Sequence, residues 1–401
     1  MKLKIDHFTG LYTFSFAAIG VFFPLIGQYL EKIGFSGVEI GIVTASATGI
    51  GIISNSFWGS VYHRRNGSKK LIVFLCIITA LLAQSLIAVK QFEIFLLLYI
   101  IVFFFEQPIF PLIDSTTIES NYPFGAARKW GAVGFATGIG VAGFVADRAG
   151  IISIFPMFSI FFLLTGLLLG ILIHQRRDYP SRTMITGRRE KQSDIFTVAK
   201  SGGYKKLIHN RKYMALLVST FFVNGTSLAH NTYFGFLYTD AGGTVAGMGV
   251  ALLLMVISEA PFMAWSEKFS AKFSMERIIL IAMCVSALRW LWYGTAPDPV
   301  LLTVSFFIQG FSNGIILVET VKYISKIVSP AMISLAIPLY TALSTNLGTI
   351  TCQLAGGILV ENFGGAGVYI FYGVFNIIGI LIYLLSGLHK TKKRVRNIYY
   401  Q

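Results

Sequence analysis

Twelve near-continuous apolar runs dominate the sequence, and each is long enough to cross a membrane. They cover roughly residues 8–30, 38–61, 70–89, 93–115, 128–147, 151–174, 213–238, 244–266, 277–295, 299–321, 331–360 and 366–388. A membrane-spanning helix needs about 20 apolar residues. Charged residues make up only 13% of the 401, against about 25% in soluble domains. We therefore predict an all-α membrane protein and exclude a soluble globular one.

One long polar stretch, residues 175–212, separates six runs from the other six. It contains eleven Lys and Arg residues against three Asp and Glu. Basic loops between spans stay on the cytoplasmic side of a membrane. The predicted organisation is an N-terminal six-helix bundle (1–175), a cytoplasmic basic linker (176–212), a C-terminal six-helix bundle (213–388) and a cytoplasmic basic tail (389–401).

The positions of the 33 Lys and Arg residues predict the orientation. With the N-terminus inside, 29 of them lie in segments that face the cytoplasm, Lys32, Lys90 and Arg148 lie outside, and Arg289 lies within a span. This asymmetry follows the positive-inside rule, so we predict a multi-pass protein of the cell membrane with both termini cytoplasmic. Because the charge lies in short loops beside the spans, the net charge of +15 does not indicate nucleic-acid binding.

The two halves resemble each other. Trp58 and Trp265 both lie near the end of a second span, 207 residues apart, and the polar residues Asp114 and Lys322 are 208 apart. The segments GFVADRAG and GILVENFGG both stand at the end of a span, the fifth and the eleventh. Parallel six-helix halves predict a two-bundle, pseudo-symmetric transporter with its site between the bundles, near the middle of the membrane.

Three segments resemble the lactose-permease-like branch of the major facilitator superfamily, whose members are proton symporters. They are PLIDSTTIESNYPFGAARKWGAVGF, SEAPFMAWSEKF and SALRWLWYG, which begin at Pro111, Ser258 and Ser286. The resemblance implies substrate binding by Arg128, proton coupling by Arg289 and an acidic eighth-span residue, Glu259. The tenth-span His and Glu of the lactose permease have no match here, so galactoside specificity is not implied.

The superfamily's loop motif, Gly-x-x-x-Asp-Arg-x-Gly, is altered in this chain. It reads GSVYHRRNGSKK from Gly59, with His63 in place of the aspartate and Arg64 retained. Gly59 and Arg64, together with Asp114 and Lys322 at the inner ends of their spans, are our candidate gating residues. Lys322 is three residues after Glu319, and this spacing favours a solvated ion pair.

Two ionisable residues lie deep within spans of the second half. Arg289 is twelve residues past Arg277, about 18 Å along a helix, and Glu259 lies seven residues before the inner end of its span, about 10 Å from the same face. The long arginine side chain can cover this difference in depth. A charge near the centre of a bilayer costs at least about 2.5–3.5 kcal/mol, so each needs a partner or an aqueous site. We predict that Glu259 and Arg289 pair, with Glu259 taking the proton. The alternative is a permanent bridge between two helices.

Other polar residues within spans are candidates for proton or substrate contact. Glu106 and Gln107 adjoin Pro108, where a helix kink can expose backbone carbonyls to a cavity. His230 is the only histidine deep within a span, and polar side chains of this kind can also hold helices together. The predicted proton-coupling residues are Glu259, Arg289, Glu106 and His230. The predicted substrate-binding residues are Arg128, Glu106, Gln107, Asn224, His230, Asn231, Tyr233, Gln309 and Asn313.

The sequence contains no motif for an enzyme cofactor. Cys76, Cys284 and Cys352 lie far apart inside apolar spans, without metal-ligand spacing, and no phosphate-binding glycine loop is present. We expect no metal, no cofactor and no catalysis, and a monomer whose partners are protons, a small solute and the lipid bilayer. The first hypothesis is proton-coupled symport of a sugar or nucleoside by alternating access. The alternatives are a proton-driven exporter of amphipathic compounds and a non-transporting membrane receptor.

Overall fold

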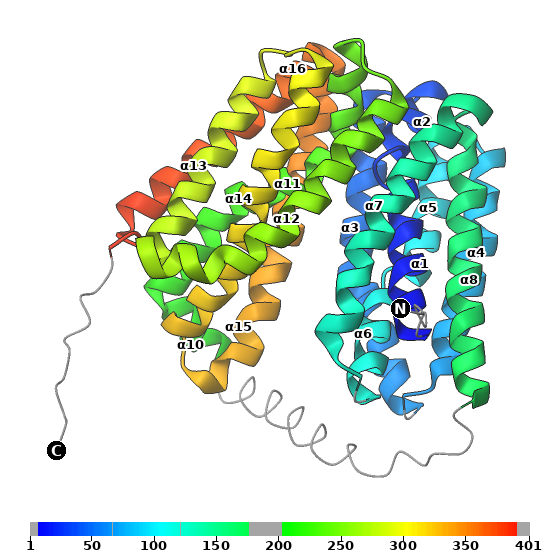
Figure 1. Ribbon diagram of the computed structural model, residues 1–401, viewed down its shortest axis with the longest axis horizontal. Helices are drawn as coiled ribbons and strands as arrows, with labels where there is room; N and C mark the ends of the chain where they lie inside the picture. The colour runs from blue at the N-terminus through cyan, green and yellow to red at the C-terminus, as the bar shows by residue number, and fades with distance from the viewer. Residues whose placement is uncertain (1–6, 66, 121, 176–202, 391–401) are drawn as a thin grey trace, which may run out of the picture.

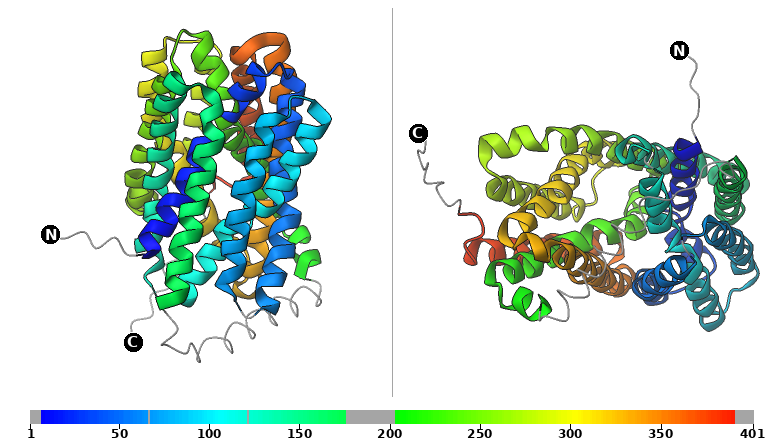
Figure 2. Two further views of the ribbon diagram at one scale, coloured as in Figure 1. Left: turned by 90° about the vertical axis from the view of Figure 1, so that its right-hand side faces the viewer. Right: turned by 90° about the horizontal axis from the view of Figure 1, so that it is seen from below.

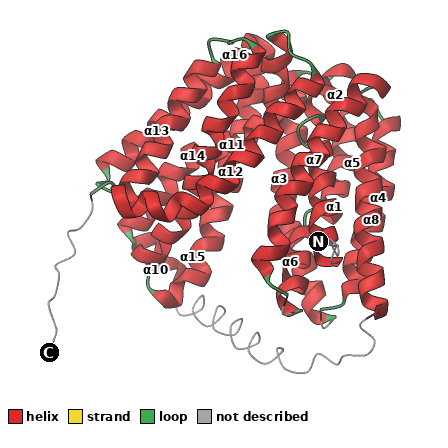
Figure 3. Cartoon of the chain, viewed as in Figure 1, coloured by secondary structure: helices red, strands yellow, loops and turns green. Residues whose placement is uncertain are grey.

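The computed structural model describes residues 7–65, 67–120, 122–175 and 203–390, and in these residues it contains helices and loops but no strand (Figure 3). The first half contains α1 (His7–Phe22), α2 (Ile26–Lys32), α3 (Gly37–Arg64), α4 (Lys69–Ser85), η1 (Leu86–Ala88), α5 (Phe92–Glu106), α6 (Ile109–Glu119), α7 (Phe124–Ala149), η2 (Ile151–Ser153) and α8 (Ile154–Gln175). The second half contains α10 (Gly203–His209), α11 (Arg211–Asp240), α12 (Val245–Phe273), α13 (Met275–Tyr293), α14 (Pro299–Ile327), η4 (Pro330–Met332), α15 (Ile333–Tyr340), the π-helix η5 (Thr341–Asn346) and α16 (Leu347–Leu385). Most of the predicted linker, and the tail from residue 391, lie outside the described residues.

Each of the twelve predicted spans corresponds to helix in the structure. Nine helical segments are long and apolar enough to cross a membrane, among the described residues. The last of these, Ile333–Leu385, covers two predicted spans. The boundary between them is Gly364 of α16, where a φ of 66° breaks the helix. The helices α11 and α13 supply the remaining two spans. They are not among the nine, since α11 is rich in polar residues and α13 carries Glu276, Arg277 and Arg289.

The helices form two bundles that lie side by side when seen from below (Figure 2, right) and that meet at one end and diverge toward the other (Figure 1). At the end where they meet, which we call the converging end, α3 packs against α16 and α7 packs against α12. One cluster of buried apolar side chains runs through the first bundle and continues into α11, α12, α13, α14 and α16 of the second. A separate cluster, around Ile279, Ile315 and Tyr383, fills the rest of the second bundle. The bundles therefore share a core only on one side of the molecule.

Glycines allow the closest helix contacts within each bundle. A Cβ at Gly134 of α7 would clash with the carbonyl oxygen of Thr13 on α1, and one at Gly225 of α11 would clash with the backbone of Gly348 on α16. Small residues let helices approach in this way in membranes, where no hydrophobic effect drives them together. A Cβ at Gly140 would meet no atom within 4 Å, so this glycine is not needed for close approach.

We expect Gly134→Ala to destabilise the protein and Gly140→Ala, on the same helix, to leave it unchanged. The added methyl at residue 134 meets backbone, which cannot move aside, and overpacking of this kind costs about 1–3 kcal/mol. The midpoint of thermal unfolding in detergent measures both variants. Equal midpoints for the two would contradict the packing of α1 on α7.

Candidate functional site in two polar clusters

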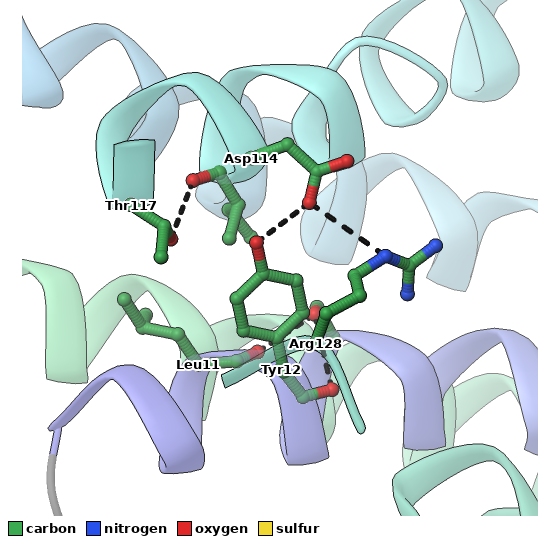
Figure 4. Close-up of polar contacts among 7 residues, drawn as sticks. Leu11, Tyr12, Asp114, Thr117 and Arg128 are labelled. Carbon is green, nitrogen blue, oxygen red and sulfur yellow. Dashed lines mark hydrogen bonds and ion pairs between the residues drawn. The ribbon is translucent and has the colours of Figure 1, made fainter. Parts of the chain in front are cut away.

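A polar cluster in the first bundle joins α1, α6 and α7 (Figure 4). The hydroxyl of Tyr12 on α1 donates a hydrogen bond of 2.6 Å to Oδ1 of Asp114 on α6. The same oxygen lies 3.8 Å from Nε of Arg128 on α7. Tyr12 is fully buried, whereas the side chains of Arg128 and Asp114 are 40% and 32% exposed. The cluster therefore reaches from the core of the bundle to an accessible surface.

Aromatic rings of α1 hold the Arg128 guanidinium in place. Its central carbon lies 4.3 Å from the ring centroid of Phe16 and 5.7 Å from that of Tyr12. The ion pair uses Nε, and the two terminal nitrogens point away from Asp114 (Figure 4). A guanidinium placed in this way can donate paired hydrogen bonds to a ligand.

The sequence predicted Arg128 and Asp114 for separate roles, and the structure brings them together. It also adds Tyr12 and Phe16, which sequence reasoning missed. Their signal in the sequence is weak: they are two aromatic residues four apart on the first span, which is equally typical of a packed core.

Glu106 and Gln107 lie where α5 gives way to α6. α5 ends at Glu106, Pro108 precedes α6, and the break agrees with the predicted effect of proline. The Glu106 side chain is buried, at 1% exposure, and neither carboxyl oxygen has a hydrogen-bond partner among the described residues. Gln107 is half-buried beside Gly51 of α3. Glu106 is thus a polar group available to a proton, a water or a ligand.

Arg289 forms the centre of a second cluster, in the other bundle. It is 4% exposed, and its Nη1 donates hydrogen bonds to Oε1 of Gln309 at 2.5 Å and to the hydroxyl of Tyr293 at 3.4 Å. Its guanidinium lies over the ring of Trp290, 3.9 Å from the centroid. Hydrogen bonds and a cation–π contact therefore stabilise the buried charge.

The predicted ion pair between Arg289 and Glu259 is not formed in this structure, and this prediction was wrong for this conformation. Glu259 is partly exposed on α12, and its backbone packs against Gly310 and Gly314 of α14. The depth of a residue along its helix, from which the pairing was predicted, does not determine its direction around the helix. The Arg289 guanidinium donates hydrogen bonds to Gln309 and Tyr293 instead.

His230 lies beside Arg289 in the same cluster. Its side chain is fully buried, its Nδ1 lies 2.6 Å from the hydroxyl of Tyr369, and its ring centroid is 4.8 Å from that of Trp290. The second ring nitrogen, Nε2, has no partner among the described residues, and the same is true of Nε of Arg289 and Nε2 of Gln309. Three residues predicted from three different spans thus surround Trp290 and Tyr293 with unused hydrogen-bonding groups.

The remaining predicted substrate residues are Asn224, Asn231, Tyr233 and Asn313. Nδ2 of Asn224 donates to the hydroxyl of Tyr340 at 2.6 Å, immediately before the π-helix η5, and π-helical turns are frequent at functional sites. The hydroxyl of Tyr233 donates to the carbonyl of Gln353 at 2.5 Å, which matches the alternative of a contact between helices. Asn231 has a buried Oδ1 without a partner in the described residues. Asn313 is half-buried on α14, one turn after Gln309.

The remaining candidate gating residues lie at helix ends. Gly59 has open space around it, and Arg64 is exposed in the last turn of α3. Lys322 forms the predicted ion pair with Glu319, at 3.2 Å, but the Glu319 side chain has no exposed surface. The pair is therefore partly buried, and the prediction of a solvated pair was wrong, because this face of α14 packs inside the bundle.

Two helical bundles that share a core on one side only, each with ionisable side chains buried inside it, define a secondary transporter of the major facilitator type. The chain matches the MFS_1 like family over residues 6–371, and it belongs to this family of transporters, which are not enzymes.

The chain is similar to known transporters of sugars and nucleosides. It is 30% identical to the maltose permease of Geobacillus stearothermophilus over 379 residues, which cover 93% of this chain and 92% of the permease. It is 23% identical to the putative nucleoside transporter YegT of Escherichia coli strain K12, covering 85% of this chain and 81% of that protein. The crystal structure of the nucleoside transporter NupG has the same fold, with a TM-score of 0.80 at 17% identity, covering 96% of this chain and 99% of that one.

We expect Gln309→Leu to destabilise the protein through the buried charge of Arg289. A hydrogen bond to a charged group contributes about 1.5–3 kcal/mol, and this one is lost while the charge remains. Arg289→Met in the Gln309→Leu background should recover part of the loss, because the charge is then gone as well. The thermal unfolding midpoints of the two single variants and the double variant form the cycle. Strictly additive effects would show that the two side chains do not interact.

Proposed function

We propose that this protein is a proton-coupled symporter for a small polar solute of the sugar or nucleoside class, and that it works by alternating access. The observation that carries the proposal is the partly exposed Arg128 guanidinium, held over Phe16 by Asp114. Its two terminal nitrogens, which point away from Asp114, suit hydroxyl or carbonyl oxygens, and the neighbouring aromatic rings suit the flat face of a sugar or a base. The maltose permease and the nucleoside transporters among its relatives support the same solute classes.

Proton coupling is assigned to Glu259, Glu106, Arg289 and His230. We propose that Glu259 carries a proton in this conformation, in which the Arg289 guanidinium donates a hydrogen bond to Gln309. A more polar environment around Glu259 in the opposite conformation would favour its charged form and release the proton. Glu106 is the second candidate proton site, because both of its oxygens lack a partner in the described part of the chain.

The orientation follows from the charge distribution. With both termini in the cytoplasm of the cell, the converging end of the bundles faces outward and the diverging end faces the cytoplasm. The structure then corresponds to an inward-facing state. We expect the polar clusters at Arg128 and Arg289 to be present both in this state and in an outward-facing one.

The solute class is tested first by thermal-shift screening of the purified protein with sugars, nucleosides and aromatic acids. Stabilisation by a sugar or a nucleoside is the expected result, since only ligands that bind the folded state raise its unfolding midpoint. Stabilisation by amphipathic compounds alone would favour the proton-driven exporter.

We expect Glu259→Gln to abolish proton uptake driven by the stabilising solute in proteoliposomes, because an amide cannot carry a proton. Glu93→Gln is the matched control, since Glu93 is an exposed acid in the first turn of α5 and should leave the flux unchanged. Solute-driven proton flux is measured with a pH-sensitive dye inside the vesicles. Unimpaired flux in Glu259→Gln would refute the coupling assignment while leaving the solute class intact.

A further inference from the structure

An acidic residue follows a glycine by one helical turn at two related places. Gly143 and Asp147 lie in the last two turns of α7, and Gly357 and Glu361 precede the break in α16. Both members of each pair are offset by 214 residues between the halves. The two pairs therefore occupy corresponding positions, and both lie at the converging end of the bundles.

Each of these carboxylates bonds to the other bundle. Oδ2 of Asp147 accepts a hydrogen bond from the backbone N–H of Ala246, at 3.2 Å, and Oε2 of Glu361 accepts one from the N–H of Val38, at 3.1 Å. Ala246 is the second residue of α12 and Val38 is the second residue of α3. The acid of one bundle thus caps the N-terminus of a helix in the other, twice.

The capped helices show why a second acceptor is needed. At the N-terminus of α3 the Ser36 side chain accepts from the N–H of Glu39, and at that of α12 the Thr244 side chain accepts from the N–H of Gly247. Each helix therefore satisfies its third N–H itself and leaves the second to the opposite bundle. The first N–H groups of a helix lack partners within it, and its dipole favours a negative charge there.

The glycines allow the two bundles to approach closely enough for these bonds. A Cβ at Gly143 would crowd the backbone of Val245 and Ala246, and one at Gly357 would clash with the backbone of Gly37. A residue four positions later lies on the same face of a helix. The glycine therefore lets the N-terminus of the opposite helix approach, and the acid one turn later accepts a hydrogen bond from the second N–H of that helix.

We propose that Asp147 and Glu361 form a two-part latch that stabilises the conformation in which the bundles converge at this end. When the bundles separate here, as alternating access requires, both helix N-termini lose their anionic caps. The latch depends on the separation of the bundles alone, so it goes beyond the proposed solute and proton coupling and can be tested without either.

The test measures distances across the converging end in the protein reconstituted in nanodiscs. Cys76, Cys284 and Cys352 are replaced by serine, and spin labels are placed at Gln91 and Thr295, which are exposed in loops of the first and second bundle. Asp147→Asn with Glu361→Gln removes both charges and keeps the side-chain shapes. We expect the population of longer distances, read by pulsed electron paramagnetic resonance, to rise about threefold or more. Each single variant should give a smaller rise.

Asp298→Asn is the matched control. The Asp298 side chain accepts a hydrogen bond of 2.8 Å from the N–H of Val300, and both residues belong to the second bundle. Removing the charge of this cap should leave the distances across the bundles unchanged. The latch is refuted if the double variant gives the wild-type distance distribution, or if Asp298→Asn shifts the distribution as much as the double variant does.

Discussion

The cost of placing ionisable side chains in a membrane governs this structure. Arg289 and Glu106 are almost fully buried in membrane-spanning helices, and Arg128 and Asp114 are partly exposed there. Such groups must find protein partners or water, because lipid offers neither charge nor hydrogen bonds. Arg289 is stabilised by Gln309 and by the ring of Trp290, whereas Arg128 is stabilised by Asp114 and Phe16. In both clusters, helices of a single bundle surround the charged group. The polar groups therefore lie inside the bundles, and the lipid-facing surfaces stay apolar.

Polar groups also find protein partners where the two bundles meet. Gly37 of α3 and Gly357 of α16 bring two backbones together, and Asp147 and Glu361 satisfy N–H groups that no helix can satisfy by itself. The two carboxylate hydrogen bonds are exposed, whereas Gly37 and Gly357 are buried. An interface of this kind can open while each bundle stays intact, which is the mechanical requirement of alternating access.

The fold was largely predictable from the sequence, because the length of an apolar run and the charge of a loop are local properties. The twelve spans and the division into two halves follow from them. The site was less predictable. Arg128 and Asp114 were recognisable as polar residues in apolar surroundings, whereas Tyr12 and Phe16 look like ordinary core residues until a guanidinium lies over them. The pairing of Glu259 with Arg289 failed because helix depth was known and helix rotation was not. The matching segments around Asp147 and Glu361 were visible as a repeat, but only the packing of the bundles shows that each caps a helix of the other.

We propose that the Arg128 cluster faces water and solute between the bundles. Its most direct test is the labelling of Arg128→Cys, in a background without native cysteines, by a membrane-impermeant maleimide. We expect rapid labelling from the cytoplasmic side of the membrane, because the side chain of residue 128 is partly exposed. Absence of labelling from both sides, in a folded variant, would place residue 128 against lipid or in a closed core and would contradict the account.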